Sequence, residues 1–351
     1  MDYISGDIWT PDGILAGYVV IEDGRIAEIV EGACPGTPVC SGLVIPAPID
    51  AHTHIGDAGL CLDRRYSLEE LVAPPNGVKH RFLSGTPRKE LVSGMRAFSE
   101  RLLAGGFSGF IDFREGGTEG CRMLREASES AVILGRPVSE AFDQNETDDL
   151  LRMADGIGIS GMRDMDHRYV ENLAEAAHRA GKMFALHASE NRRDDIDSIL
   201  ALEPDFLVHM CASEKEDLRK CADSDVPIVV CARSNMYFGL VPPIKDMLDA
   251  GVRVAVGTDN AMLCDADSGA ELDAFTNVLM SQGGDRLDAV RCLAEGGKKI
   301  LNDGANIGLR AGAEADMAVY RIRNCGIEVV RFAPGLQRRA DNGIQEYTRT
   351  H

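Results

Sequence analysis

Apolar and polar residues alternate at both ends of the chain in the manner of half-buried strands. In the first 47 residues, the run YVVIEDGRIAEIV holds two alternating stretches around Asp23-Gly24, a pair that favours a tight hairpin turn. Alternation returns in GLRAGAEADMAVYRI near the other end. Because a period of two is typical of strands with one buried face, we predict that residues 1–47 and 306–351 form one small β-sandwich domain, discontinuous in sequence.

The middle of the chain has another pattern, in which short apolar runs alternate with stretches of helical spacing. The run LVIPAPIDAHTH ends in polar residues, as a parallel strand does when its carboxyl end carries chemistry. Helical stretches such as RYVENLAEAAHRAG end in glycine, a common helix stop. The apolar runs predict eight strands, at residues 43–49, 107–113, 131–138, 156–162, 182–188, 205–211, 226–232 and 252–259. Eight repeats of strand and helix predict an α/β fold, a (β/α)8 TIM barrel, over residues 48–305.

One connection in the predicted barrel is unusually long. Residues 60–83, which contain Pro74-Pro75-Asn76-Gly77, exceed the length of an ordinary loop between a strand and a helix. Such a segment is either a lid over the site or an insertion without that role. We favour the lid.

Composition and charge narrow the class of protein. Hydrophobic residues make up 44% and charged residues 26% of the chain, and no apolar run is long enough to cross a bilayer, which indicates a soluble globular protein. The formal net charge of −19 would repel nucleic acids and anionic membranes overall, so we expect neither as a partner. The charge says little about a small-molecule substrate, which we expect, and a homo-oligomer is left possible. The start MDYISGDIWTPDG lacks an export signal, which predicts a cytoplasmic protein. The ten cysteines include no CxxC pair, which argues against a disulfide framework or a zinc ribbon.

Histidines gather at the ends of the predicted barrel strands. His52 and His54 lie two residues apart, so both side chains point to the same side of their strand. A pair of this kind is weak evidence by itself, because two buried histidines can simply bond to polar neighbours. His187, His209 and Asp259, however, end the fifth, sixth and eighth predicted strands. Since the carboxyl ends of barrel strands converge, the sequence predicts a catalytic site for one divalent metal ion.

Glu190 follows His187 by three residues, in LHASE, and is therefore expected to face the same cavity. Hydrolysis assisted by a metal needs a group that takes a proton from water and returns it to the leaving atom, and a carboxylate suits that task. The alternative is a glutamate that stabilises the first turn of a helix. We favour the catalytic role.

Other polar residues are candidates for substrate binding by position alone. Arg114 follows the second predicted strand together with Glu115, and Arg233 and Asn235 follow the seventh. Each could equally form an ordinary supporting ion pair or hydrogen bond. His80, in the long connection, is a solvated loop residue in the simplest interpretation and a substrate contact in the other.

The runs GLVIPAPIDAHTH, LHASE, LVHMC, RSN and VAVGTDNA together resemble the amidohydrolase superfamily. Within it they look like the mononuclear branch, which contains cytosine, adenosine and S-adenosylhomocysteine deaminases, triazine chlorohydrolases and imidazolonepropionase. The resemblance implies that zinc or iron is bound by His52, His54, His187 and Asp259. It also implies that Glu190 shuttles the proton and that His209 bonds to the attacking water or the substrate. Binuclear relatives use a lysine on the fourth strand, and GIGISGM contains none, so one metal ion is expected.

We therefore expect a metal-dependent aminohydrolase that deaminates a purine, a pyrimidine or a related heterocycle. A cyclic amide or imidazolone hydrolase of the same superfamily is the nearest alternative. A barrel kept as a non-catalytic subunit is a third, against which the complete ligand set argues. The segments GTDN and HTHIGDAGL depart from the pattern of nucleoside deaminases, which leaves the substrate open.

Overall fold

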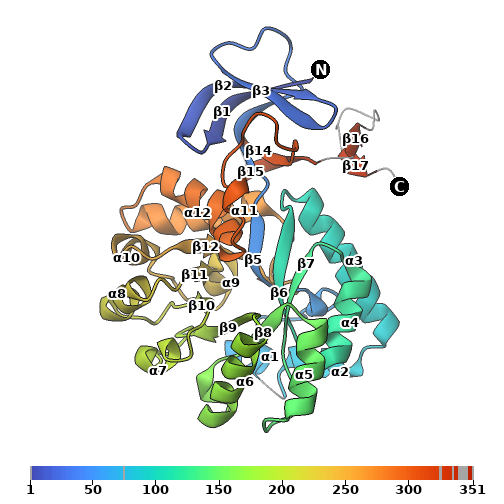
Figure 1. The fold of residues 1–351 in the computed structure, drawn as a ribbon, viewed down its shortest axis with the longest axis vertical. Coiled ribbons are helices and arrows are strands. Elements are labelled where there is room, and N and C mark those ends of the chain that lie inside the picture. The colour runs from blue at the N-terminus through green and yellow to red at the C-terminus, as the bar shows by residue number, and fades with distance from the viewer. Residues whose placement is uncertain (1, 74–75, 324–325, 334–335, 339–346, 350–351) are drawn as a thin grey trace.

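The computed structural model describes residues 2–73, 76–323, 326–333, 336–338 and 347–349. Two sheets dominate the fold (Figure 1): a large parallel sheet with helices packed around it, and a smaller sheet at one end of the molecule. No helix in the described part of the chain is long and apolar enough to cross a membrane.

The large sheet has nine strands in the order β12-β11-β10-β9-β8-β7-β6-β5-β13, and neighbouring strands are parallel. The two edge strands of that order, β12 and β13, are separated along the chain only by Gly257 and Thr258, so the sheet curls back on itself. This arrangement is consistent with a TIM-like barrel. The strands are β5 (Ile49–His54), β6 (Gly109–Arg114), β7 (Ala131–Gly135), β8 (Gly156–Ile159), β9 (Met183–Ala188), β10 (Phe206–His209), β11 (Ile228–Val230), β12 (Val254–Val256) and β13 (Asp259–Asn260).

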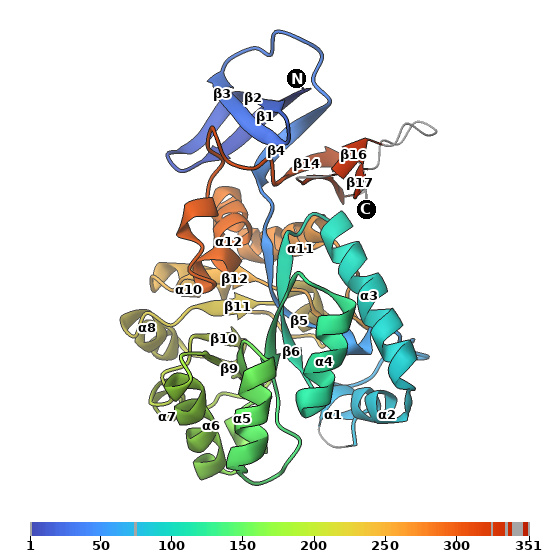
Figure 2. The ribbon, with the colours of Figure 1, turned by 45° about the vertical axis from the view of Figure 1, so that its right-hand side comes forward.

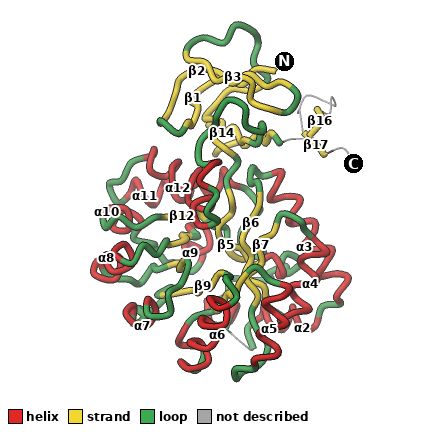
Figure 3. Tube along the Cα trace, viewed as in Figure 1, coloured by secondary structure: helices red, strands yellow, loops and turns green. Residues whose placement is uncertain are grey.

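Helices cover the outer face of this curled sheet, as the turned view in Figure 2 and the colouring in Figure 3 show. Several begin at an aspartate whose carboxylate accepts hydrogen bonds from the first free backbone N–H groups; Asp143, Asp166, Asp267 and Asp285 are examples. The helices are α3 (Arg88–Ala104), α4 (Gly117–Ala127), α5 (Gln144–Met153), α6 (His167–Arg179), α7 (Ile196–Leu200), α8 (Lys215–Asp223), α9 (Ala232–Tyr237), α10 (Ile244–Asp249), α11 (Ser268–Ser281) and α12 (Arg286–Ile300).

Alternation along each strand divides the apolar residues between two clusters. In β10, Phe206 and Val208 belong to a cluster enclosed by the curled sheet, whereas Leu207 belongs to the cluster beneath the helices. Ile111 and Phe113 of β6 point inward in the same way, and Phe110 points outward. Strands buried on both faces therefore read as continuous apolar runs, which is why the sequence pattern located them.

The smaller sheet combines strands from both ends of the chain in the order β15-β14-β4-β1-β2-β3. Its strands are β1 (Asp2–Thr10), β2 (Gly13–Glu22), β3 (Arg25–Glu31), β4 (Cys40–Pro46), β14 (Met317–Arg323) and β15 (Gly326–Phe332). Val319 of β14 lies opposite Val44 of β4, and both side chains belong to a core separate from that of the large sheet. We expected a β-sandwich; the structure places these six strands in a single sheet. Two short strands, β16 (Leu336–Arg338) and β17 (Tyr347–Arg349), form a separate pair, and the other residues predicted for this domain beyond 333 lie outside the described residues.

The predicted first barrel strand, residues 43–49, was wrong. Its residues up to Pro46 end β4 in the smaller sheet, and the barrel strand is β5, which contains His52 and His54 themselves. Proline explains the break, because Pro46 and Pro48 have no N–H group to continue a ladder of hydrogen bonds.

The long connection contains two short helices, α1 (Leu68–Val72) and α2 (Val78–Gly85). Ser67 caps α1 together with Glu70 in a reciprocal capping box. The predicted segment thus has secondary structure of its own. Its residues 74 and 75 lie outside the described residues.

The close approach of β1 to β4 generates a test of the smaller sheet. Gly6 has φ +135°, and a Cβ atom there would lie 1.9 Å from the Gly42 carbonyl oxygen; Gly13 has φ +115°, but a Cβ atom there would meet nothing within 4 Å. Gly6→Ala therefore adds overlap to backbone strain, and we expect it to lower the free energy of unfolding by about 1–3 kcal/mol more than Gly13→Ala. Urea denaturation of both variants measures the difference. Equal losses would show that β1 can move away from β4 freely.

Candidate metal centre and active-site cavity

The predicted site residues meet at the carboxyl ends of the large sheet's strands. His52 and His54 lie in β5, His187 in β9, His209 ends β10, and Asp259 begins β13. A cavity of about 330 Å³ opens there, a size suited to a small molecule. Its wall includes four of these residues and Glu190.

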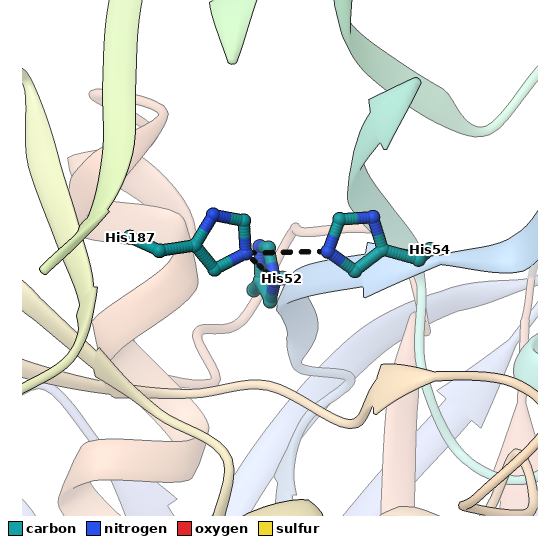
Figure 4. A group of neighbouring side chains, drawn as sticks. All are labelled: His52, His54 and His187. Atoms are coloured by element: carbon teal, nitrogen blue, oxygen red, sulfur yellow. Dashed lines mark hydrogen bonds between the residues drawn. The ribbon is translucent and has the colours of Figure 1, made fainter. Parts of the chain in front are cut away.

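Three imidazole rings and one carboxylate direct their donor atoms at one point. The Nε2 atom of His187 lies 3.2 Å from Nε2 of His54 and 3.2 Å from Nε2 of His52, and Figure 4 shows the three rings with these contacts dashed. Asp259 Oδ1 lies 3.5 Å from His52 Nε2 and 3.7 Å from His54 Nε2. The structure thus brings together all four predicted ligands, with His209 beside them.

The other ring nitrogens show why this arrangement suits a cation. The Nδ1 atoms of His54 and His187 lie 3.1 Å from the Phe113 carbonyl oxygen and 2.9 Å from that of Ile159, so each Nδ1 carries the proton that it donates. Both Nε2 atoms then present lone pairs, and two acceptors cannot satisfy each other. Bonds of about 2.0–2.1 Å to a tetrahedral metal ion would separate neighbouring ligand atoms by roughly 3.3 Å. The observed spacing therefore fits a divalent metal ion.

Burial keeps these rings neutral. Removal from water lowers the pKa of His52 to about 3 and the pKa of His209 to about 4, and it lowers the pKa of His187 well below its usual value. Burial alone would raise the pKa of Asp259, but the hydrogen bond with His52 and the neighbouring imidazoles hold it well below its usual range. At neutral pH His52 and His187 are thus neutral and Asp259 is ionised, the forms that bind a metal ion.

The backbone around the ligands is strained. Asp259 has φ +70° and His209 has φ +76°, values that residues with side chains rarely adopt, at a cost of about 1–3 kcal/mol each. The Ser234 hydroxyl donates a hydrogen bond of 2.5 Å to Asp259 Oδ2, which leaves Oδ1 for the cluster. Such strain is typical of functional sites, where surrounding contacts fix a side chain in one direction.

Glu190 lines the cavity beside His209. Its Oε1 atom lies 3.6 Å from His209 Nε2. The preceding residue, Ser189, has φ +46°, so the chain turns sharply between β9 and Glu190. On the far side of the ring, Asn235 Nδ2 lies 3.1 Å from His209 Nδ1 and fixes the ring's orientation. A carboxylate and an imidazole thus face one cavity with the metal ligands.

The predicted substrate residues are placed differently. His80 lines the cavity and bonds to the Val72 carbonyl oxygen. Arg114 is 2% exposed and lies behind the cavity wall, where its guanidinium packs over Gly56; Arg233 approaches Glu271, and Asn235 supports His209. None of these three residues lines the cavity.

Four cationic residues of the cavity wall were not predicted, namely Lys79, Arg136, Arg163 and Arg192. Lys79 comes from α2, in the long connection, and Arg136 follows β7. Arg136 lies near the end of the run 131–138, which the sequence predicted as the third barrel strand. A polar residue at the end of a strand was therefore a signal available in the sequence. Lys79 had no such signal, since the connection has no regular pattern.

The sequence profile of the amidohydrolase family matches residues 43–331. The chain belongs to that family. It is a hydrolase that acts on carbon–nitrogen bonds. The predicted resemblance is thereby confirmed at the level of the family.

Named relatives and a solved structure agree with this assignment. The chain is 36% identical over 282 residues to a "Putative aminohydrolase" of Methanothermobacter thermautotrophicus, a match that covers 73% of each protein. It is 25% identical over 368 residues to the 5-methylthioadenosine/S-adenosylhomocysteine deaminase of Halobacterium salinarum, covering 90% of this chain and 82% of that protein. The structure of guanine deaminase from C. acetobutylicum with bound guanine superposes with a TM-score of 0.71 at 16% identity, over 91% of this chain and 90% of that one, which shows a shared fold.

A buried carboxyl group behind the site generates a test by pH. Glu271, on α11, is 0% exposed; its Oε1 accepts a hydrogen bond of 3.2 Å from the Arg233 backbone, next to Ser234. Burial raises the pKa of Glu271 from 4.5 to about 8, although Arg233 opposes the shift. Between these values the folded state holds a proton that the unfolded state has lost, so its stability should fall as the pH rises.

We therefore expect the free energy of unfolding of the wild type, relative to Glu271→Gln, to fall between pH 4.5 and 8 by up to about 1.4 kcal/mol per pH unit. Urea denaturation of the metal-free proteins across this range measures it. Glu100→Gln, at an exposed position of α3, controls for the general loss of a carboxyl group. A difference that does not change with pH would mean that Arg233 keeps Glu271 ionised.

Proposed function

We propose that this amidohydrolase is an aminohydrolase that deaminates a purine, a pyrimidine or a related heterocycle with the help of one divalent ion, zinc or iron. The observation that supports it most is the position of Glu190, which lines a small-molecule cavity together with His54, His187 and Asp259, three of the four converging ligand side chains. The names of the relatives, an aminohydrolase and a deaminase of adenine-containing thioethers, point to the same reaction.

His52, His54, His187 and Asp259 would hold the ion in this proposal. When bound, a divalent ion supplies positive charge that lowers the pKa of water and polarises an electrophilic carbon. The carbonyl oxygens of Phe113 and Ile159 orient two of the rings by accepting their Nδ1 protons.

Glu190 carries out the proton transfers in the proposed reaction, and His209 positions the reacting groups. A Glu190 carboxylate oxygen takes a proton from the attacking water and later delivers it to the nitrogen that leaves. His209, neutral because burial lowers its pKa to about 4, uses Nε2 to position the water or the substrate, while Asn235 holds its Nδ1. Cleavage of the exocyclic carbon–nitrogen bond then releases ammonia.

A cyclic amide or imidazolone hydrolase remains the second candidate, because the same residues could open a ring. The two reactions differ in their products, since ring opening releases no ammonia. A non-catalytic subunit is opposed by the complete set of ligand side chains together with Glu190. An ammonia-release screen with the metal-loaded protein separates the deaminase from the other two candidates.

The finer architecture is part of the same proposal. We propose that β12 and β13 are one interrupted strand, so that the curled sheet is a closed barrel of eight strand–helix units over residues 48–305. Residues 1–47 and 306–351 would then form the second domain. The pairing of β14 with β4 supports this division.

Arg136 guides the choice of substrates for the screen. Among the charged residues of the cavity wall, Lys79 pairs with Glu115, Arg163 with Asp194, and Arg192 with Glu69. No ion pair of the half-buried Arg136 is found among the described residues. S-adenosylhomocysteine, which carries a carboxylate, and 5-methylthioadenosine, which carries none, should therefore be compared directly.

The metal content of the purified protein is the first test. We expect close to one equivalent of zinc or iron per chain by elemental analysis, because one cluster of donor atoms converges. His187→Ala removes the nitrogen shared by the two shortest contacts and should lose most of the metal. His178→Ala, in helix α6, provides the matched control and should retain it. Two equivalents in the wild type would contradict a mononuclear site.

Glu190→Gln tests the reaction itself. Glutamine keeps the shape and the hydrogen-bonding capacity of the side chain but cannot accept the proton, so turnover should fall at least about 100-fold while metal content and melting temperature stay unchanged. The measurement uses the substrate that the screen identifies. Full turnover by this variant would place the proton transfer elsewhere.

A further inference from the structure

A buried ion pair joins the long connection to one of the proposed metal ligands. Lys79, on α2, is 3% exposed, and its Nζ atom lies 2.5 Å from Glu115 Oε1. The same Glu115 oxygen lies 3.3 Å from His54 Nδ1. One carboxylate oxygen therefore links the ammonium group of α2 to the ring whose opposite nitrogen enters the ligand cluster.

The other carboxylate oxygen of Glu115 is fixed from behind. Glu115 Oε2 accepts a hydrogen bond of 2.5 Å from Arg114 Nη2, and Arg114 Nη1 lies 3.3 Å from Asp112 Oδ1. Asp112 in turn accepts hydrogen bonds from the Thr53 hydroxyl and the Ile55 backbone, on either side of His54. Glu115 is thus held rigidly on the barrel side, and Lys79 is its contact on the side of the long connection.

Two other polar contacts of the long connection with the barrel are exposed, and the connection also packs Phe82 and Leu83 against the main hydrophobic core. Arg192 reaches Glu69 at 3.6 Å, and these two side chains are 70% and 72% exposed, so water screens that pair. Arg65 donates to the Tyr237 carbonyl oxygen, also at an exposed position. Lys79 and Glu115, with side chains 4% and 13% exposed, form a pair that loses its water when α2 is seated. Removal of Glu115 leaves the buried Lys79 without this counter-charge, which is costly, whereas removal of Lys79 leaves Glu115 paired with Arg114 alone.

We propose that Lys79 and Glu115 are positioning residues that fasten helix α2 to His54, so that seating this helix slows the release of the metal ion. Glu115 accepts the Nδ1 proton of His54 together with the Phe113 carbonyl oxygen and holds the Nε2 lone pair toward the cluster. Lys79 holds Glu115 in that place only while α2 lies against the barrel. The inference rests on the metal site proposed above.

Zinc release measures this coupling without any substrate. The zinc-loaded wild type, Lys79→Met, Glu115→Gln and the double variant are mixed with a chelating dye, and the rate of zinc transfer is recorded. Loss of a group that supports a ligand typically weakens metal binding about 10–100-fold, so each single variant should release zinc faster by that factor. Because the two residues act as a unit, the double variant should release zinc about as fast as either single variant. Lys89→Met, an exposed lysine ten residues further along the chain, is the matched control.

Further measurements separate positioning from a general structural role. Lys79→Arg keeps a cation in place and should restore slow release, whereas the melting temperature of the metal-free protein should be similar in all variants that fold. The coupling is reciprocal, so zinc should slow tryptic cleavage within residues 60–85 of the wild type and do so much less in Lys79→Met. The double variant removes both charges together and tests the pair even if Lys79→Met alone does not fold.

The outcomes are distinct. Zinc release from Lys79→Met and from the double variant at the rate of Lys89→Met would overturn the inference and leave the metal site intact. A wild type that binds no metal ion would instead overturn the proposed function. Faster release from Glu115→Gln alone, with Lys79→Met at the control rate, would restrict the supporting role to Glu115 and also overturn the link to α2.

Discussion

The convergence of unprotonated ring nitrogens at one point is the constraint on which the site depends. Lone pairs on His54 and His187 face each other at 3.2 Å, an arrangement that gains nothing without a cation between them. Bringing these groups together costs free energy. His209 and Asp259 adopt a left-handed backbone, and burial lowers the pKa of His52 and of His187. Folding must hold these groups together before any ion arrives, so rigid strand ends rather than loops carry them.

Buried aspartates hold those strand ends in register. Asp50 of β5 accepts two hydrogen bonds from Thr258, next to Asp259, and Asp57 accepts hydrogen bonds from Asn260 and Met262 on the other side of that ligand. Asp112 holds Thr53 and Ile55 around His54 in the same way. The proposed ligands from β5 and β13 are therefore positioned by carboxylates that bridge the strands. Burial raises the pKa of Asp50 to about 7, and the hydrogen bonds to each carboxylate offset the cost of removing it from water.

The sequence could predict the chemistry because of two simple rules. Side chains alternate along a strand, so His52 and His54 had to share a face, and parallel strands end at one edge, so His187, His209 and Asp259 had to approach them. These rules do not say where a chain turns after its strand. For Arg114 the sequence left a substrate contact and a supporting ion pair equally open; it is the last residue of β6, and its guanidinium packs over Gly56, where any side chain would collide with it. The first barrel strand was misplaced for a related reason, since the apolar pattern does not show that the prolines divide one run between two sheets.

These two rules do not predict the part of the cavity wall that the long connection forms. The strands and their aspartates define the metal cluster, whereas part of the wall opposite it comes from α1 and α2, whose residues follow no period. Leu68 and Val72 add apolar surface there, and Lys79 adds a charge that is neutralised by a residue of the barrel rather than by its own segment. The cavity is therefore formed by the ends of the barrel strands and by the long connection, and the two parts are joined by the ion pair of Lys79 with Glu115. Because Glu115 also contacts His54, a change at Lys79 affects both the cavity wall and the surroundings of the ligand cluster.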